Sequence, residues 1–346
     1  MRDTGTDETW MLRALEQARC GLGATSPNPA VGAVIVRDGN ILGQGYHECA
    51  GEAHAERRAI RDAIERGNGD LLRGADIYVT LEPCSSHGKT PPCTDALIET
   101  GFRRVIYGAV DPDKRHRGRA DALLSAAGIQ VLGRVSEEAC RAFLRPWMHA
   151  VETGRPWVVA KAAVTFDGRM TRRTERWLSG AEALSYAHDL RLESDAILVG
   201  GCTVRTDDPS LTIRSAKRAV PRKKVQPWRI VLTHQRDNLP AQARIFTDEY
   251  ADRTRVYENV GDMVGFLESL RGELGITQLM LECGGKLMRR FFEENLINEW
   301  VQIMTPYIGG GKDLMLPGDY LPIEQKLDRV SMEQVGRDYV LRGITC

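Results

Sequence analysis

One histidine, one glutamate and two cysteines in the first hundred residues have the types and spacing of a catalytic zinc site. His54-Ala55-Glu56 is followed by Cys84, which lies 28 residues past Glu56 and directly after Pro83, and then by Cys93. An imidazole and two thiolates fill three positions of a tetrahedral zinc ion and leave the fourth open for water. Zinc lowers the pKa of that water from about 16 to about 7, and a nearby carboxylate can then transfer protons. The pattern predicts hydrolytic removal of an amino group.

The spacing of the two cysteines is longer than usual, so their flanks decide the interpretation. Nucleobase deaminases place the pair as Cys-x-x-Cys, whereas eight residues separate Cys84 from Cys93. Without their neighbours, two cysteines and a histidine are more often small buried residues and a surface imidazole. Pro83, Glu56 and the Gly- and Pro-rich segment between the thiols favour zinc. We therefore expect His54, Cys84 and Cys93 to bind zinc and Glu56 to be catalytic.

The elements that must position these residues alternate between helices and strands. The first 145 residues contain predicted helices at 9–19, 54–66, 93–100 and 120–127. Predicted strands lie at 31–36, 41–46, 76–81, 105–110 and 129–132. This alternation indicates a layered α/β structure. Both halves of the zinc site would then lie at helix N-termini, where the helix dipole favours thiolate over thiol.

A second α/β domain is predicted after a boundary near residues 143–156, where Gly154-Arg155-Pro156 is a turn signal. The domains are expected to span residues 1–147 and 148–346. Predicted strands of the second domain lie at 157–163, 196–200, 229–232, 256–257, 278–282 and 300–304, with closing strands in 326–342. Predicted helices lie at 181–193, 261–273 and 286–295. The insert 216–226 contains five Lys or Arg residues, which indicates a solvated loop, with phosphate contact as the alternative.

Four segments of the second half belong together if this domain binds a phosphorylated cofactor. They are residues 161–169, Trp177, residues 200–214 and residues 282–286. In the last segment a strand ends in Gly-Gly before a helix, so a phosphate can approach the backbone N–H groups of the helix N-terminus. Taken alone, Gly-Gly before a helix is usually only a turn. The chain contains no Gly-x-Gly-x-x-Gly, so the Rossmann fingerprint is absent.

Composition excludes several classes of function. Lys plus Arg equals Asp plus Glu at 47 each, and no basic stripe with interleaved aromatic residues indicates a nucleic-acid partner. The N-terminus lacks the apolar run of a signal peptide, and no stretch approaches the 18 apolar residues that span a bilayer. The eight cysteines are dispersed, which favours free or metal-bound thiols. We therefore expect a cytoplasmic protein with a small-molecule partner, no nucleic acid and no membrane.

Motifs in both halves carry a resemblance to a known family. In the first half they are Pro27–Val36, Gly45–His47, His54–Glu56, Thr80–Cys84, Gly88–Cys93 and Asp111-Pro112. In the second half they are Asp167–Arg169, Ser194–Leu198, Thr203, Asp207–Pro209, Leu211–Arg214 and Glu282–Gly285. With these motifs the chain resembles the bifunctional riboflavin biosynthesis enzymes, a pyrimidine deaminase fused to a pyrimidine reductase. The resemblance implies a cytidine-deaminase-like N-terminal domain, a dihydrofolate-reductase-like C-terminal domain, Zn²⁺, NADPH and a homo-oligomer.

The resemblance also implies a substrate and its contacts. The substrate would be 2,5-diamino-6-ribosylamino-4(3H)-pyrimidinone 5′-phosphate, which is deaminated and then reduced from ribosyl to ribityl. The implied contacts with the deaminase substrate are Asn28, His47 and Lys89. The implied contacts with the reductase substrate are Lys161, Arg191, Leu211, Arg214 and Glu282. The implied contacts with NADPH are Ala163, Trp177, Thr203, Asp207, Gly284 and Gly285.

Several positions depart from the family pattern while the zinc and proton-transfer positions stay intact. The departures are Ser86 for a usual His, Asp113 for Asn, Arg57 for Val, Glu175 for Ser, and His234 for a small hydroxyl residue. They cluster where phosphate and sugar should be bound. They fit either a riboflavin enzyme that has drifted or a paralogue in a flavin-like (azapteridine, toxoflavin-type) pathway whose reductase half is altered or silent. A non-enzymatic scaffold with structural zinc is a third reading, against which the intact Glu56 argues.

Overall fold

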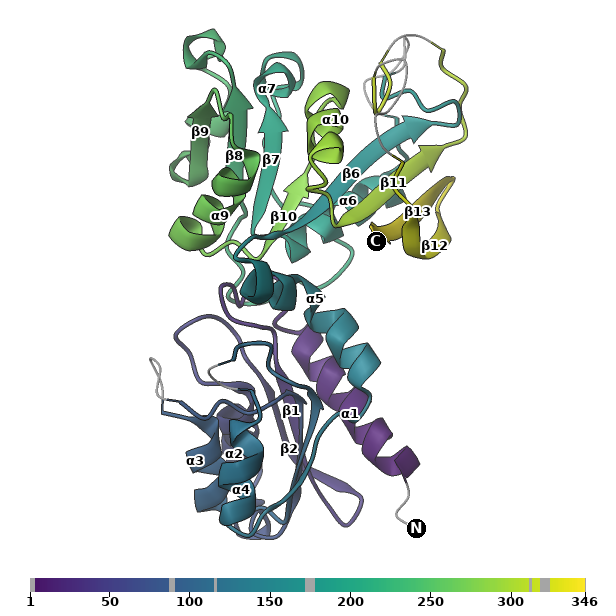
Figure 1. Cartoon of the computed structure of the whole chain (residues 1–346). Coiled ribbons are helices and arrows are strands. Elements are labelled where there is room, and N and C mark those ends of the chain that lie inside the picture. The colour runs from purple at the N-terminus through teal and green to yellow at the C-terminus, as the bar shows by residue number, and fades with distance from the viewer. Residues whose placement is uncertain are drawn as a thin grey trace. The chain divides into compact units, whose positions relative to one another are not determined.

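The computed structural model divides the chain into two compact units, each with its own sheet (Figure 1). It describes residues 4–86, 91–114, 117–171, 178–310, 313–317 and 324–345. Unit 1 comprises Met1–Gly154 with Pro221–Lys224, and unit 2 comprises Arg155–Val220 and Val225–Cys346. Within the described ranges, no helix is long and apolar enough to cross a membrane.

Unit 1 is a five-stranded sheet with helices on both faces. The strands are β1 (Gly32–Arg37), β2 (Asn40–Tyr46), β3 (Asp76–Leu81), β4 (Arg104–Ala109) and β5 (Gln130–Leu132), in the order β2-β1-β3-β4-β5. The helices are α1 (Thr4–Arg19), α2 (Ala55–Glu65), α3 (Cys93–Thr100), α4 (Arg119–Ala126) and α5 (Glu137–Thr153). In Figure 1, α1 and α5 lie on one face of the sheet and α2, α3 and α4 on the other. β3, β4 and β5 are parallel, so their carboxyl ends meet at one edge.

The small residues of α2 and β2 bring helix and strand into close contact. Ala59 and Ala63 are fully buried on the inner face of α2. Opposite them, a Cβ atom at Gly43 would lie 2.4 Å from the carbonyl oxygen of Ala59, closer than any side chain could pack. The absence of a side chain at Gly43 therefore lets α2 pack directly against β2. His54 lies at the N-terminus of this helix.

Unit 2 is an eight-stranded mixed sheet in the order β12-β13-β11-β6-β10-β7-β8-β9. The strands are β6 (Trp157–Thr165), β7 (Ala196–Gly200), β8 (Trp228–Thr233), β9 (Thr254–Glu258), β10 (Gln278–Leu281), β11 (Glu299–Thr305), β12 (Leu327–Val335) and β13 (Asp338–Thr345). The helices are α6 (Ala181–Glu193), α7 (Gly201–Asp207), α8 (Arg244–Thr247), α9 (Met263–Leu274) and α10 (Gly285–Glu293). The strands β6 to β11 pair in parallel, and β12 and β13 run antiparallel.

Two apolar cores lie on the two faces of this sheet. Alternate residues of β6 contribute to one core or the other, because successive side chains of a strand point to opposite faces of the sheet. Val158 and Ala160 pack in the core that α9 and α10 cover. Trp157 and Val159 pack in the core that includes residues of α6 and α7. A parallel sheet covered on both faces is the arrangement expected from its continuous apolar strands.

The layered α/β architecture and nearly all predicted elements are confirmed, but three helices were missed: α5, α7 and the four-residue α8. Residues 143–156 were expected to form a boundary, whereas α5 continues through Pro146 and ends at Gly154, which has φ +74°. The first compact unit includes the chain up to Gly154, and the expected boundary between residues 147 and 148 lies inside α5. The second missed helix, α7, begins directly after β7. Its first residue, Gly201, has no room for a side chain, because a Cβ atom there would lie 2.8 Å from Thr233 Oγ1.

Candidate active sites

The three expected metal ligands of unit 1 converge from separate elements. His54 precedes α2, Cys84 follows β3, and Cys93 opens α3. His54 Nδ1 lies 3.2 Å from Cys93 Sγ and 3.6 Å from Cys84 Sγ, and the three donor atoms lie within 4.8 Å of one another. Zinc bonds of about 2.0–2.3 Å in tetrahedral geometry put ligand atoms roughly 3.6 Å apart. The donor set and its spacing therefore fit a zinc ion.

The two thiols are electrostatically unequal. The Cys93 backbone N–H donates to Cys84 Sγ at 3.2 Å. Hydrogen bonds from the Cys93 side chain and from His54 lower the pKa of Cys84 to about 4. The Cys84 sulfur and burial raise the pKa of the Cys93 thiol. Two adjacent thiolates repel each other, and a divalent cation between them favours ionisation of both.

Glu56 lies in the first turn of α2 and is 3% exposed. Burial, followed by the negative charge of Cys84, raises the pKa of the Glu56 carboxyl group. A carboxyl group with a raised pKa can both accept and return a proton near neutral pH. The charges of Cys84 and His54 both act on this pKa, so the carboxyl group lies beside the cluster.

Asn28 and His47 form a fixed pair next to the cluster. His47 Nδ1 lies 3.2 Å from the carbonyl oxygen of Ala53, and Nε2 lies 3.1 Å from Asn28 Nδ2. Burial lowers the pKa of His47, so a neutral ring donates to Ala53 through Nδ1 and accepts from Asn28 through Nε2. The rings of His47 and His54 pack edge to face with centroids 5.3 Å apart. The contact orients the Asn28 amide and joins this pair to the zinc ligands. Lys89, the third expected substrate contact, lies outside the described residues.

Glu82 holds the backbone of a neighbouring loop. The sequence analysis did not include it among the expected site residues. Its carboxylate accepts N–H bonds from Asp111 at 3.2 Å and Gly118 at 2.7 Å. Burial raises its pKa, partly offset by these two bonds. Asp113 lies in this loop, and its N–H donates to Asp111 Oδ1 at 2.8 Å. The available signal was a glutamate inside the quoted Thr80–Cys84 motif, directly before Pro83.

Two other departures from the family pattern have defined surroundings. Arg57 reaches from α2 to the carbonyl oxygen of Pro92 with Nη2 at 3.1 Å, next to the residue that opens α3. His234 follows β8, is exposed, and has Nδ1 3.4 Å from Asn259 Oδ1. Glu175 lies outside the described residues.

In unit 2 the expected site residues gather at the carboxyl ends of adjacent parallel strands. Lys161 is the middle residue of β6, level with the end of β10, and Ala163 lies nearer the carboxyl end of β6. Glu282 follows β10. Thr203 and Asp207 lie on α7, which follows β7. Because β6, β10 and β7 are neighbours in the sheet, these residues meet at one edge. Ligands of open α/β sheets bind outside this edge.

Glu282 is the centre of a charged cluster. Its Oε1 lies 3.1 Å from Lys161 Nζ, and its Oε2 lies 2.9 Å from Arg191 Nη2. Burial alone would raise the pKa of Glu282, but Arg191 and Lys161 lower it to about 2. Two cations around one carboxylate leave net positive charge, which suits a phosphorylated substrate.

Leu211 and Arg214 lie in the loop between α7 and β8. Leu211 is buried and has φ +50°. Arg214 Nη1 donates to Ser210 Oγ and, at 2.7 Å, to Thr212 Oγ1. Its backbone N–H donates to His188 Nδ1 at 3.2 Å. His188 is a further site residue that the sequence analysis missed, although a histidine three residues before Arg191 was the available signal.

The two glycines at the start of α10 have different surroundings. A Cβ atom at Gly284 would meet nothing within 4 Å, so its backbone is open to a ligand. A Cβ atom at Gly285 would lie 2.4 Å from the carbonyl oxygen of Leu314. The backbone at Leu314 therefore leaves no room for a side chain at position 285. Trp177, another expected cofactor contact, lies outside the described residues.

Comparisons with known proteins agree with both halves of this description. The model of the RibD C-terminal domain matches residues 156–341, and that of the cytidine and deoxycytidylate deaminase zinc-binding region matches residues 4–109. Riboflavin biosynthesis protein RibD of Aquifex aeolicus is 35% identical over 97% of both chains. RibD of Actinobacillus pleuropneumoniae is 36% identical over 98% of this chain and 95% of its own. The expected deaminase and reductase domains and the expected zinc are thereby confirmed.

Solved structures extend the similarity to the whole chain. RibD of Acinetobacter baumannii has a TM-score of 0.90 at 31% identity, covering 99% of this chain and 100% of its own. A Thermotoga maritima protein described as a diaminohydroxyphosphoribosylaminopyrimidine deaminase/5-amino-6-(5-phosphoribosylamino)uracil reductase has a TM-score of 0.86 at 31% identity, covering 99% of both chains. On this evidence the chain belongs to the RibD family of riboflavin biosynthesis proteins.

Proposed function

We propose that the chain catalyses two successive steps of riboflavin biosynthesis. The first is hydrolytic deamination of 2,5-diamino-6-ribosylamino-4(3H)-pyrimidinone 5′-phosphate, and the second is NADPH-dependent reduction of its ribosyl group to ribityl. The observation that carries the proposal is the convergence of His54, Cys84 and Cys93 beside a buried Glu56, in a chain that also contains the family's reductase domain.

Glu56 is the proton carrier of the proposed deamination. His54, Cys84 and Cys93 would hold zinc, which when bound polarises a water molecule and lowers its pKa. Glu56 accepts the proton that the attacking water releases and donates it to the departing amine, which leaves as ammonia. Asn28, whose amide is held by His47, orients the pyrimidine ring. Lys89 is proposed to contact polar or phosphate groups of the substrate.

The reductase half needs positioning more than acid–base chemistry. NADPH supplies the hydride, and its proposed contacts are Ala163, Trp177, Thr203, Asp207, Gly284 and Gly285. The sugar phosphate would lie against the positive cluster at the strand ends, with Lys161, Arg191, Leu211, Arg214 and Glu282 as its proposed contacts. Holding two reactants in one geometry can supply much of the rate.

An anaerobic assay with the freshly prepared diaminopyrimidine ribosyl phosphate tests the proposal. Ammonia release is measured with and without NADPH, and NADPH oxidation is followed in parallel, with Glu56→Gln as the control. We expect ammonia first and NADPH oxidation only after it. No ammonia from the zinc-loaded protein would refute the substrate assignment. Ammonia without NADPH oxidation would favour the alternative, a paralogue with a silent reductase half. No observation described above supports that alternative.

We also propose that the chain forms a homo-oligomer in the cytoplasm. Strand β12, at the edge of the unit 2 sheet, is exposed along most of its length, and Val330 and Met332 are 60% and 65% exposed. Exposed apolar side chains on an edge strand favour association. Light scattering should give a mass above that of one chain, and Met332→Lys should lower it. A monomer at micromolar concentration would contradict the proposal, and cell fractionation tests the location.

A further inference from the structure

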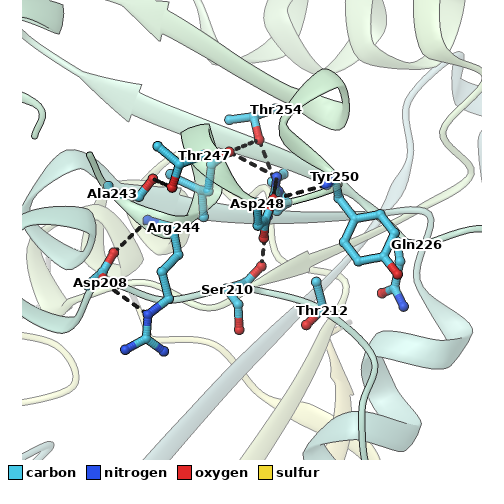
Figure 2. A network of polar contacts seen from close by, with 12 residues as sticks. Asp208, Ser210, Thr212, Gln226, Ala243, Arg244, Thr247, Asp248, Tyr250 and Thr254 are labelled. Carbon is cyan, nitrogen blue, oxygen red and sulfur yellow. Dashed lines mark hydrogen bonds and ion pairs between the residues drawn. The ribbon is translucent and has the colours of Figure 1, made fainter. Parts of the chain in front are cut away.

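A fully buried arginine lies beneath the loop that carries Leu211 and Arg214. Arg229, on β8, is 1% exposed. Each of its five N–H donors has an acceptor: Asp248 Oδ1 at 2.8 Å, Asp248 Oδ2 at 2.7 Å, Thr254 Oγ1 at 3.0 Å, Ile245 O at 2.9 Å and Ser210 O at 3.1 Å. Figure 2 shows Asp248, Thr254 and Ser210 in this network.

Stability alone is a weak reason for this arrangement. Burying an ion pair carries a desolvation penalty, and a well-packed apolar replacement is often equally stable or more so. An arginine with all five donors satisfied instead fixes the positions of its acceptors. One of these acceptors, the Ser210 carbonyl oxygen, belongs to the loop of the proposed substrate site.

The same loop is held on both sides of Ser210. The Arg244 N–H donates to Asp208 Oδ1 at 2.8 Å, and Arg244 Nε lies 3.0 Å from Asp208 Oδ2, as Figure 2 shows. Further along, Gln226 accepts from the Ile213 N–H at 2.7 Å and donates to the Ile213 carbonyl oxygen at 3.2 Å. The loop is therefore anchored before, at and after Ser210.

The backbone of the loop needs these anchors. Leu211 follows Ser210 with φ +50°, a left-handed conformation that is unfavourable for a residue with a Cβ atom. Such conformations persist when the surroundings hold them in place. The Ser210 side chain also accepts a hydrogen bond from the Arg214 guanidinium, so the position of Ser210 sets that of Arg214.

We propose that Arg229 and Asp248 are positioning residues for the reductase substrate site. Arg229 holds the Ser210 carbonyl oxygen, which keeps Leu211 in its left-handed conformation and presets the Arg214 guanidinium for the sugar phosphate. Neither Arg229 nor Asp248 contacts the substrate. The inference rests on the proposed role of Arg214 in substrate binding.

Asp248→Asn tests the proposal in the full-length zinc-loaded protein. The substitution keeps the volume but turns an amide NH₂ toward the guanidinium, which weakens the hold on Ser210. We expect the reductase KM for the deaminated substrate to rise about tenfold with kcat within about twofold, the pattern of lost uniform binding. The KM for NADPH and the deaminase kcat/KM should stay unchanged. Amide exchange of the 209–215 peptide should become at least about tenfold faster.

Glu299→Gln is the matched control. Glu299 is buried in the same unit, pairs with Arg342 and accepts from Trp157 Nε1 at 3.1 Å, so the variant also removes the charge of an arginine partner. It should leave the substrate KM and the exchange of the 209–215 peptide unchanged. Equal KM increases in both variants would mean general destabilisation and would overturn the proposal, as would an unchanged KM in Asp248→Asn.

Two further variants separate the possible failures. Ser210→Ala removes one of the two side-chain acceptors of Arg214 and leaves Thr212 Oγ1 in place. It decides the question if Asp248→Asn does not fold: its KM should rise about threefold, and an unchanged KM would overturn the proposal. Arg214→Gln tests the proposed function itself. If Arg214→Gln raises KM and Asp248→Asn does not, the positioning inference fails while the substrate assignment stands. If neither variant raises KM, the substrate assignment fails and the inference with it.

Discussion

His188 lies on α6, buried among the charged side chains of the reductase site. Its Nδ1 accepts the Arg214 N–H at 3.2 Å, which requires that nitrogen to be unprotonated. Burial, then the charges of Arg191 and Arg214, lower the pKa of His188 to about 4. Lys161 acts in the same direction, and Glu282 opposes it. An imidazole in the unfolded chain has a pKa of about 6.5.

This difference makes the stability of unit 2 depend on pH. Below about pH 6.5 the unfolded chain binds a proton at His188, whereas the folded chain binds it only below about pH 4. The free energy of unfolding therefore falls as the pH is lowered from about 6.5 to about 4, and the full contribution of His188 is present above about pH 6.5. Each pKa unit corresponds to about 1.4 kcal/mol, so the loss between pH 7 and pH 4.5 is roughly 2–3 kcal/mol. The carboxylate of Glu282, with a pKa of about 2, stabilises the fold down to about pH 4.3 and loses its contribution only below that pH.

The perturbation that isolates the effect is His188→Gln, whose amide oxygen can accept the Arg214 N–H but does not titrate. The free energy of unfolding of unit 2 is measured by native-state amide exchange of peptides from β6 and β10 at pH 4.5, 5.5 and 7. Wild type should lose roughly 2–3 kcal/mol more than the variant between pH 7 and pH 4.5. Parallel pH curves would refute the reasoning, because they would show that His188 binds its proton equally in the folded and unfolded chains.

Three predictions concern unit 1. Glu56→Gln should lower ammonia release by at least about 10³-fold, while the zinc content and the reduction of the synthetic deaminated substrate stay normal. Retained ammonia release would show that Glu56 is not the proton carrier. Cys84→Ser should bind less than about a tenth of the wild-type zinc by metal analysis, with normal NADPH oxidation on the deaminated substrate, and full zinc occupancy would contradict the ligand assignment. Gly43→Ala places a methyl group 2.4 Å from the Ala59 carbonyl oxygen, so it should lower the unfolding free energy by about 1–3 kcal/mol in urea titrations, and unchanged stability would show that α2 has room to shift.

The zinc ligands could be predicted from the sequence because each lies next to a local signal. His54 precedes α2, Cys93 opens α3, and Cys84 follows the buried strand β3, so element prediction alone places all three next to the ends of helices or strands. The alternation of strands and helices likewise predicted the α/β architecture. The start of α10 shows the limit of such signals, because the Gly284-Gly285 pair alone gives no indication that one glycine is open and the other covered by Leu314.

The sequence by itself determined the chemistry of unit 1 and the order of its elements, since both follow from short-range spacing and periodicity. Only the tertiary structure decided the roles of Glu82, His188 and Arg229, whose partners lie 16 to 36 residues away along the chain. Helix α5 was missed because Gly154-Arg155-Pro156 indicates a boundary, whereas packing in the core of unit 1 keeps the chain helical through Pro146. Burial and long-range hydrogen bonds override local preference at such positions, because free energy is gained there from contacts that no local pattern records.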